Sequence, residues 1–503
     1  MDPTRELLPV LTGQEMRDWE LRAFAGGAIS ERVVLESAGR AVAQAVADYF
    51  PDGKVVAAVG RGNNGGDAIV ALRTLLAWGR EVAAFGSPDS AQRIELTHGW
   101  DVPFHEAVEE ACRGAGVVLD GILGTGASGA PRDAARMMIR AMNEANAPVV
   151  AVDGPSGVDL ATGATVGEAV QAEMTVTFGT VKQGLLLHPG REHAGRILLA
   201  EVGFPPFDER RRASVITDRW AREHLPQIPP DAHKGRTGIV AVAAGRHGFA
   251  GAAVMAAMGA LRTGAGGVRL VSTEDNRELL QTAVPEALFV GREDVAFEER
   301  LAGIASALVG PGIGVDDAGE ALLRRILHLR VPSVLDADAL SLLAERADLR
   351  TALSQDAIVL TPHPGELGRL LGCSTSEILA DRPGSARDAA ERFDAVVLAK
   401  GTPSLVAIPD GTLLFGTTGH SGLATGGMGD TLGGVIAALL AAGLKPAEAA
   451  AVGLHFAGRA AEVAGQGRGL LPRDVAEALP EVLAGGSPSR SVRPFLLNLP
   501  AVY

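Results

Sequence analysis

The sequence predicts two α/β domains, each built on a mostly parallel β-sheet that is covered by helices. Short runs of Val, Ile and Leu alternate with segments of helical period along the whole chain, which is typical of this class. At 503 residues the chain exceeds the usual size of one domain, roughly 100–200 residues. The chain also carries 64 glycines, well above the usual share of roughly 7%. This excess predicts glycine-rich loops where backbone approaches a ligand closely.

The expected strands of the first half cover residues 55–59, 82–85, 117–119 and 149–152. A helix is expected from about residue 68 to residue 78, directly after the first glycine-rich loop. Each of these strands ends in a polar or glycine-rich stretch. Ligands of open α/β sheets bind at the carboxyl ends of strands, so these loops are where a binding site is expected.

A break in the alternation between residues 204 and 236 marks the domain boundary, because prolines and three consecutive arginines interrupt it there. The predicted organisation is a first domain of residues 1–215, a linker of residues 216–232 and a second domain of residues 233–503. Strands of the second half are expected at residues 239–243, 268–271, 307–309, 333–335, 358–360 and 396–398, and the apolar run 432–444 reads as a core helix. The two halves share no period, which favours two different domains.

The charge balance argues against nucleic acid and anionic membranes as partners, because 60 acidic and 46 basic side chains leave a net charge of −14. Cys112 and Cys373 fit neither a zinc spacing nor a disulfide scaffold, which favours a reducing compartment. The first residues lack the apolar core of a signal peptide. We therefore expect a cytoplasmic protein that acts on small molecules, and a homo-oligomer.

Three oxygen-rich loops follow strands of the first half: residues 60–67 (GRGNNGGD), 120–126 (DGILGTG) and 153–159 (DGPSGVD). Oxygens of Asn64, Asp120 and Ser156 suit a hard cation. One carboxylate among neutral oxygens favours a monovalent ion, and potassium is the best fit.

Several motifs in order, Met16-Arg17 and residues 35–40 (LESAGR) followed by these three loops, make residues 1–205 resemble the YjeF N-terminal family of NAD(P)H-hydrate epimerases. The resemblance implies a Rossmann-like α/β/α domain and potassium at Asn64, Asp120 and Ser156. It also implies that the hydrated cofactor contacts Asn63, Asn64, Gly65, Gly66, Asp67, Gly124, Thr125, Gly126, Ala127, Ser128, Gly129, Ala130 and Asp153. Either Asp67 or Asp153 is a candidate acid or base. The sequence departs from the family pattern at Glu20, Ala68 and Gly154.

The second half carries residues 425–432 (TGGMGDTL) directly before an apolar helix. Backbone amides at a glycine-rich helix N-terminus bind phosphate oxygens, and Asp430 beside them is placed to take a proton from an attacking hydroxyl. This arrangement is similar to that of the ribokinase-like kinases. Lys400 offers a point charge for phosphate, and His363 stands between two prolines after a predicted strand.

Together with His233-Lys234-Gly235 and residues 335–340 (LDADAL), these motifs make residues 230–490 resemble the YjeF C-terminal family of ADP-dependent NAD(P)H-hydrate dehydratases, which is ribokinase-like. The resemblance implies a second three-layer α/β/α domain in which the hydrated cofactor contacts Ala252, Gly314, His363 and Asp430. It implies that the nucleotide contacts Lys400, Gly401, Thr402, Pro403, Ser404 and Gly429. Residues 244–247 (AGRH) depart from the family's usual Gly-Gly-Ser.

The resemblances together imply a bifunctional repair enzyme that interconverts the R and S hydrates of NADH or NADPH. The second domain is expected to dehydrate the S hydrate with ADP as phosphate donor, releasing AMP and phosphate, with magnesium accompanying the nucleotide. Two alternatives stay open at this point. One is a ribokinase-like small-molecule kinase, and the other is a non-catalytic nucleotide-binding scaffold.

Overall fold

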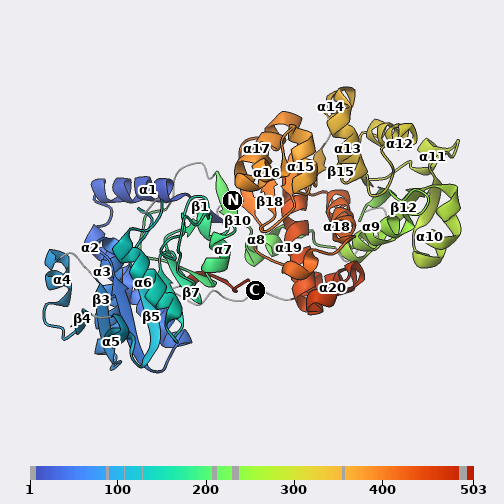
Figure 1. Cartoon of the computed structure of the whole chain (residues 1–503). Helices are drawn as coiled ribbons and strands as arrows, with labels where there is room; N and C mark the ends of the chain where they lie inside the picture. The colour runs from blue at the N-terminus through green and yellow to red at the C-terminus, as the bar shows by residue number, and fades with distance from the viewer. Residues whose placement is uncertain are drawn as a thin grey trace. The chain divides into compact units, whose positions relative to one another are not determined.

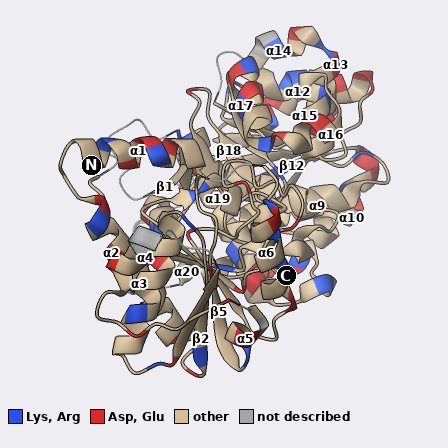
Figure 2. Ribbon diagram, turned by 60° about the vertical axis from the view of Figure 1, so that its left-hand side comes forward, with Lys and Arg blue, Asp and Glu red and all other residues tan. Residues whose placement is uncertain are grey.

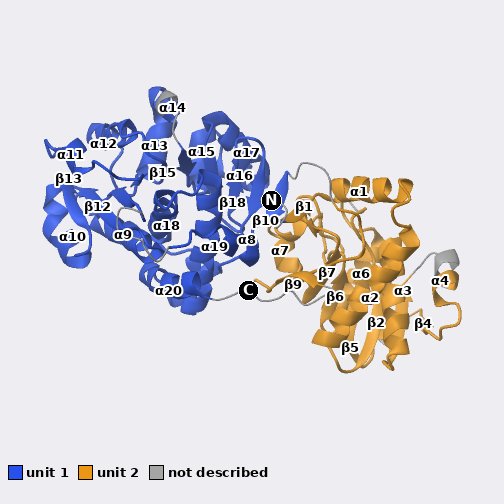
Figure 3. Ribbon diagram, turned by 180° about the vertical axis from the view of Figure 1, so that it is seen from behind, with its two compact units in different colours: residues 1–7, 211–488 blue, residues 8–210, 489–503 orange. Residues whose placement is uncertain are grey.

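The computed structural model of the chain describes residues 7–86, 90–106, 108–126, 129–206, 212–228, 237–353, 357–485 and 495–502. The chain divides into two compact units (Figure 3). Unit 1 holds residues 1–7 and 211–488, and unit 2 holds residues 8–210 and 489–503. Both units are α/β, as the sequence predicts.

Unit 2 is built on a sheet with the strand order β20-β9-β7-β6-β5-β2-β3-β4. Figure 1 labels strands β3, β4, β5 and β7 of this sheet. Every neighbouring pair in it is parallel except β20 with β9. Strands β1 and β8 pair in parallel. The elements are β1 (Leu8–Leu11), α1 (Gly13–Ala25), α2 (Glu31–Tyr49), β2 (Lys54–Val59), α3 (Asn63–Ala77), β3 (Val82–Gly86), α4 (Ser90–Thr97), β4 (Phe104–His105), α5 (Val108–Cys112), β5 (Ala115–Gly121), α6 (Asp133–Glu144), β6 (Val149–Val152), β7 (Met174–Phe178), β8 (Val181–Lys182), α7 (Gly190–His193), β9 (Arg196–Ala200) and β20 (Phe495–Leu499).

Alternate residues of β2 enter two different cores, which makes unit 2 a three-layer structure. Val55 and Val59 pack with helices α2 and α3 on one face of the sheet. Val56 packs with α5 and α6 on the other face. Because both faces of the sheet are covered, nearly every residue of β2 is buried, and its sequence is a continuous apolar run.

The last strand, β20, belongs to unit 2, although the sequence assigned residues 233–503 to the second domain. Phe495 and Leu499 are buried, and Phe495 joins the core beneath α2 and α3. The main chain of β20 pairs antiparallel with β9. A single short strand so far from its partner in sequence leaves no local signal of the pairing.

Unit 1 is built on a sheet with the strand order β13-β12-β11-β14-β15-β16-β17-β18-β19-β10. The neighbouring pairs from β13 to β17, and β19 with β10, are parallel, whereas β18 is antiparallel to both of its neighbours. The elements are β10 (Ala213–Val215), α8 (Asp218–His224), β11 (Ile239–Ala243), α9 (Ala250–Thr263), β12 (Gly267–Ser272), α10 (Arg277–Ala283), β13 (Leu288–Gly291), α11 (Phe297–Arg300), β14 (Ser306–Val309), α12 (Asp317–His328), β15 (Ser333–Leu335), α13 (Asp338–Glu345), α14 (Ala347–Leu353), β16 (Ile358–Leu360), α15 (Pro364–Leu371), α16 (Thr375–Ala380), α17 (Arg382–Phe393), β17 (Val396–Ala399), β18 (Leu405–Ala407), β19 (Leu413–Phe415), α18 (Met428–Ala441), α19 (Pro446–Ala464) and α20 (Pro472–Ala484).

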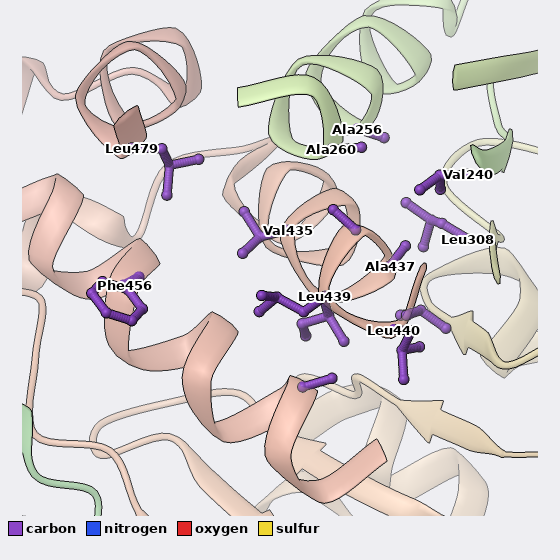
Figure 4. Packing of buried hydrophobic residues seen from close by; sticks show 14 of the residues in the cluster. Val240, Ala256, Ala260, Leu308, Val435, Ala437, Leu439, Leu440, Phe456 and Leu479 are labelled. Carbon is purple, nitrogen blue, oxygen red and sulfur yellow. The ribbon is translucent and has the colours of Figure 1, made fainter. Parts of the chain in front are cut away.

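Helices α9 and α18 pack closely in an apolar cluster of unit 1 that includes Val435 of α18 and Leu308 of β14 (Figure 4). A Cβ at Gly434 would lie 2.0 Å from the carbonyl oxygen of Ala256, and one at Gly259 would lie 2.3 Å from that of Thr431. Only glycine lets these two backbones meet. Part of the glycine excess therefore serves helix packing, and this packing fixes the position of the α18 N-terminus.

All ten strands expected from the sequence are present, because each is a mostly apolar and mostly buried run. The segment expected to be a linker differs, since residues 218–224 form α8 and Trp220 is buried in unit 1. Figure 2 shows charged residues of both signs on outer helices such as α1 and α17, while strands such as β2 and β5 are mostly tan. Within the described ranges, no helix has both the length and the apolar character that crossing a membrane requires.

Candidate active sites

The loops singled out in the first half meet at the carboxyl edge of the unit 2 sheet. Strands β6, β5 and β2 are neighbours, and the chain runs from β2 to β3 before it returns to β5 on the other side of β2. Such a reversal of strand order is where open α/β sheets bind ligands. A Cβ at Gly60 would lie 2.1 Å from the carbonyl oxygen of Ile122, so this glycine is required for the two loops to meet.

Asn64, Asp120 and Ser156 are brought together through Leu123. The hydroxyl of Ser156 donates to Asp120 Oδ1 at 2.6 Å, and the backbone amide of Ser156 donates to Asp120 Oδ2 at 2.7 Å. Leu123 N–H donates to Ser156 Oγ at 2.9 Å, and Asn64 Nδ2 donates to the carbonyl oxygen of Leu123 at 2.9 Å. The trio predicted from the sequence is therefore one hydrogen-bonded group.

The donor set of this trio fits a monovalent cation. The amide nitrogen of Asn64 is used by Leu123, which leaves its Oδ1 as an acceptor close to Gly124. Asp120 is fully buried, and burial raises its pKa to about 6 against the opposing hydrogen bonds from Ser156 and Ile122. Within the described residues, no Lys or Arg forms an ion pair with Asp120. A bound cation would therefore stabilise its carboxylate.

A second charged group lies in the same unit and consists of Glu20, Asp67, Asp153 and Lys182. Lys182 Nζ lies 2.5 Å from Asp153 Oδ1, with only 1% of the lysine side chain exposed. Burial, followed by the charges of Asp153 and Glu20, raises the pKa of Asp67 well above its usual range. Burial also raises the pKa of Glu20 to about 7. The two aspartates named from the sequence thus sit in one electrostatic environment.

The remaining residues expected to contact the hydrated cofactor belong to helix α3 and to the segment that follows β5 in the chain. Asn63 and Asn64 begin helix α3 with Gly65, Gly66 and Asp67 in its first turns. Arg17 donates to the carbonyl oxygen of Thr125, which ties helix α1 to the 124–130 loop. Gly129 and Ala130 are exposed, and Ala127 and Ser128 lie outside the described residues.

In unit 1 the glycine-rich motif forms the first turn of α18, as its sequence predicts. Asp430 occupies that first turn. Burial, followed by the charges of Asp336 and Glu366 and opposed by Lys400, raises the pKa of Asp430 to about 7. A carboxyl group in this range is well matched to accept a proton near neutral pH.

Lys400 is held directly beside this turn by two carboxylates. Its Nζ lies 2.8 Å from Asp336 Oδ1 and 3.9 Å from Glu366 Oε2. Burial acts to lower the pKa of Lys400, but the charges of Asp336 and Glu366 outweigh it and raise the pKa. A Cβ at Gly429 would lie 3.1 Å from Lys400 Nζ, so the glycine gives the ammonium room next to the helix N-terminus.

The turn of residues 400–404 carries a further basic group that sequence reasoning missed. Ser404 Oγ accepts from Gly401 N–H at 3.2 Å and donates to the Gly401 carbonyl oxygen at 3.0 Å, which closes the turn. Arg382 approaches the carbonyl oxygen of Lys400, and a Cβ at Gly401 would lie 2.4 Å from its guanidinium. Burial lowers the pKa of Arg382 to about 10, which leaves it charged at neutral pH.

His363 has both a structural role and an accessible side chain. It caps α15, with its Nδ1 accepting from Gly365 N–H at 3.0 Å, and 53% of its side chain is exposed. Gly314 N–H donates to Asp338 Oδ2 at 2.8 Å, and Ala252 lies in the first turn of α9. Ala252, Gly314 and His363 follow strands β11, β14 and β16, and Asp336 and Lys400 follow β15 and β17. These five strands are neighbours in the sheet, whereas Asp430 comes after β19 in the chain.

Two of the basic residues gave weak signals in the sequence. Lys182 ends the short strand β8, which follows the apolar run of β7 after a two-residue turn. A lysine directly after these apolar residues was the signal that the sequence offered. Arg382 is the first residue of helix α17, which carries several other charged residues. Its position in the sequence therefore did not distinguish it from an ordinary surface arginine.

Two family models match the chain. One is described as NAD(P)H-hydrate dehydratase and matches residues 240–481, and the other is described as YjeF-related protein N-terminus and matches residues 31–184. These matches confirm the resemblance of both halves and their order.

Curated relatives match over nearly the full length. The bifunctional NAD(P)H-hydrate repair enzyme of Moorella thermoacetica is 34% identical, covering 94% of this chain and 96% of its own. The Escherichia coli enzyme of the same name is 35% identical, covering 89% of this chain and 88% of its own. A ribokinase-like superfamily protein of Enterococcus faecalis shares the fold of unit 1, with a TM-score of 0.50, 24% identity, and coverage of 56% of this chain and 98% of that one.

Proposed function

Since the chain belongs to the family of bifunctional NAD(P)H-hydrate repair enzymes, we propose that unit 2 interconverts the R and S hydrates of NADH and NADPH and that unit 1 dehydrates the S hydrate with ADP. The observation that carries the proposal is that each unit presents its own polar site at the carboxyl edge of its own sheet. A kinase of the ribokinase class has no need of the site in unit 2. A scaffold has no need of a proton acceptor beside an ammonium group in unit 1.

For dehydration, Asp430 accepts the proton of the ring hydroxyl at C6 while the hydroxyl oxygen attacks the β-phosphorus of ADP. The bond from that phosphorus to the bridging oxygen breaks, and AMP leaves. The phosphate ester at C6 then loses phosphate as the ring nitrogen donates its electron pair, and loss of the C5 proton gives the dihydronicotinamide. Lys400 and the amides at the α18 N-terminus stabilise the migrating phosphoryl group.

We assign the nucleotide to the turn formed by Lys400, Gly401, Thr402, Pro403 and Ser404, with Gly429 opposite and Arg382 beside it. We assign the hydrated ring to Ala252, Gly314, His363 and Asp430. Among the described residues, no three His, Cys, Asp or Glu side chains gather as a metal site. We propose that magnesium arrives bound to the phosphates of the nucleotide.

For epimerisation, the hydrated ring would contact Asn63 to Asp67, Gly124 to Ala130 and Asp153. Asn64, Asp120 and Ser156 would hold a potassium ion, which would supply a positive counter-charge beside the buried carboxylate of Asp120. The residues of this chain then hold the loops after β2, β5 and β6 in one arrangement. Asp67, whose pKa burial raises well above its usual range, is the candidate to donate a hydrogen bond to the substrate.

Turnover of purified R and S hydrates tests this proposal. With ADP, the chain should convert the S hydrate to a product absorbing at 340 nm and release one phosphate and one AMP for each molecule. Without ADP, it should interconvert the epimers faster than the uncatalysed reaction does. A stable phosphoester as the product would indicate the kinase alternative, and absence of turnover would indicate the scaffold. We further propose that the chain is cytoplasmic and forms a homo-oligomer. Light scattering of the purified chain tests the oligomeric state.

A further inference from the structure

In the ion pair between Asp153 and Lys182, the ammonium group is fully hydrogen-bonded inside the protein, whereas the carboxylate is partly exposed. Lys182 donates to Asp153 Oδ1 at 2.5 Å, to Thr177 Oγ1 at 3.1 Å and to the carbonyl oxygen of Phe178 at 2.8 Å. An ammonium group has three protons, so these three acceptors use all of them. With 1% of its side chain exposed, Lys182 has no donor left for a substrate.

Asp153 is bound in an unsymmetrical way. Its Oδ1 accepts from Lys182, from the Thr177 hydroxyl at 3.2 Å and from the Phe178 N–H at 3.2 Å. The described residues provide no hydrogen bond to its Oδ2, while 12% of the side chain stays exposed. The carboxylate therefore presents one oxygen that is fixed by the protein and one that is available.

The backbone at Asp153 adds to this constraint. Its φ is 63°, in the left-handed region that non-glycine residues rarely adopt. Backbone strain of this kind persists only where the surroundings hold it in place. The hydrogen bond from Asp153 N–H to the Val176 carbonyl oxygen, at 2.8 Å, and the three contacts to Oδ1 hold it here.

We propose that Asp153 Oδ2 is the acceptor that binds the C6 hydroxyl of the hydrated nicotinamide during epimerisation, and that Lys182 is its positioning residue. This inference rests on the proposed epimerase function and chooses between the two aspartates that the sequence left open. Lys182 acts on the reaction only through Asp153, because all of its donors point into the protein. Asp67 then serves as the neighbouring donor.

The two roles separate in a double-mutant cycle of Lys182→Met and Asp153→Asn. Epimerisation is measured by chromatography of the R and S hydrates without ADP, after subtraction of the uncatalysed rate. We expect each single variant to lower kcat by about 10²-fold or more, with KM changed less than about threefold. We expect the double variant to be no more than about threefold slower than Asp153→Asn, because Lys182 has nothing left to position.

Thr177→Val is the matched control, because it removes a neutral hydrogen bond from both partners and leaves the ion pair in place. We expect it to lower kcat less than about tenfold. Melting curves show whether each variant folds. Lys182→Met leaves the buried carboxylate of Asp153 without its cationic partner, which destabilises the fold. If that variant does not fold, the double variant, which buries neither charge, decides the question by its comparison with Asp153→Asn.

Two results would overturn the inference. One is a further loss of tenfold or more when Lys182→Met is added to Asp153→Asn, which would give the lysine an independent role. The other is near-normal epimerisation by Asp153→Asn. A wild-type chain that does not accelerate epimerisation would instead refute the proposed function of unit 2, so the two failures are distinguishable.

Discussion

Lys400 and Asp336 are 64 residues apart in sequence, and they meet at the carboxyl ends of their strands with Nζ 2.8 Å from Oδ1. The pair holds the ammonium against the first turn of α18, where a Cβ on Gly429 would already crowd it. The charge of Asp336 raises the pKa of Asp430 and the charge of Lys400 lowers it, so this pair also influences the proposed proton acceptor. The first predictions concern that acceptor.

Asp430→Asn should abolish dehydration of the S hydrate while nucleotide binding remains. The helix N-terminus and Lys400 stay in place, and only the proton acceptor is lost, which typically costs roughly 10²–10⁴ in rate. Formation of the product at 340 nm and calorimetric titration with ADP measure the two properties. Near-normal turnover by this variant would remove Asp430 from its role.

The dehydration rate should rise with pH through about 7. The carboxylate is the active form of Asp430, and its raised pKa, about 7, means that the group is protonated and inactive below that pH. The expected profile of kcat/KM for the S hydrate is therefore low at pH 6 and reaches a plateau above pH 8. A profile that is flat from pH 5.5 to 8.5 would contradict this assignment.

Arg382→Met should raise the KM for ADP by about tenfold or more, since hydrogen bonds to charged groups contribute about 1.5–3 kcal/mol. The kcat at saturating ADP should change little, because Arg382 borders the turn of residues 400–404 and not Asp430. Arg387→Met on the same helix is the matched control, because Arg387 donates to the Gly411 carbonyl oxygen instead. Equal KM values for the two variants would exclude a role of Arg382 in nucleotide binding.

Asp120→Ala should lower epimerisation by about 10–100-fold, the range in which loss of groups that support a metal site usually falls. The only charged group of the Asn64, Asp120 and Ser156 trio is removed, so the ion should be lost. Dehydration of the S hydrate by unit 1 should be unaffected and serves as an internal control. R-hydrate consumption is measured in potassium and in a bulky organic cation, and equal rates for both proteins in both buffers would show that no cation acts there.

Removal of residues 489–503 should destabilise unit 2 and spare dehydration by unit 1. The truncation exposes the core that Phe495 and Leu499 cover, and burial of such side chains contributes about 1.5–3 kcal/mol each. The melting temperature of unit 2 should fall by on the order of 10 °C. Phe495→Ala should reproduce much of this fall, whereas Leu496→Ala, at a side chain that is 36% exposed, should not.

The sequence predicted those parts of the molecule that are encoded by local composition. The strands of both sheets are apolar runs, and the loops after β2, β5 and β6 carry the oxygen ligands that the structure joins through Leu123. Helix α3 begins at Asn63, five residues before the expected start. The sequence suggested a later start because Asn and Gly are poor helix formers. In the structure these residues are helical and form the first turn of α3.

The parts that depend on distant residues were not predictable. Helix α8 is short, and its burial through Trp220 depends on unit 1 as a whole. Lys182 was missed because its partner Asp153 lies 29 residues away and on a different strand end. Arg382 was missed for the same reason, since the turn that it borders is 18 residues further along the chain.

The pairing of β20 with β9 makes unit 1 an insertion within the chain of unit 2. On the ribosome, the strands from β2 to β9 emerge first, and domains generally begin to fold in that order. This edge of β9 then has no partner while residues 211–488 of unit 1 are synthesised, because β20 starts only at Phe495. An unpaired strand edge is a site of aggregation, so the nascent chain is exposed to aggregation at this edge until β20 emerges.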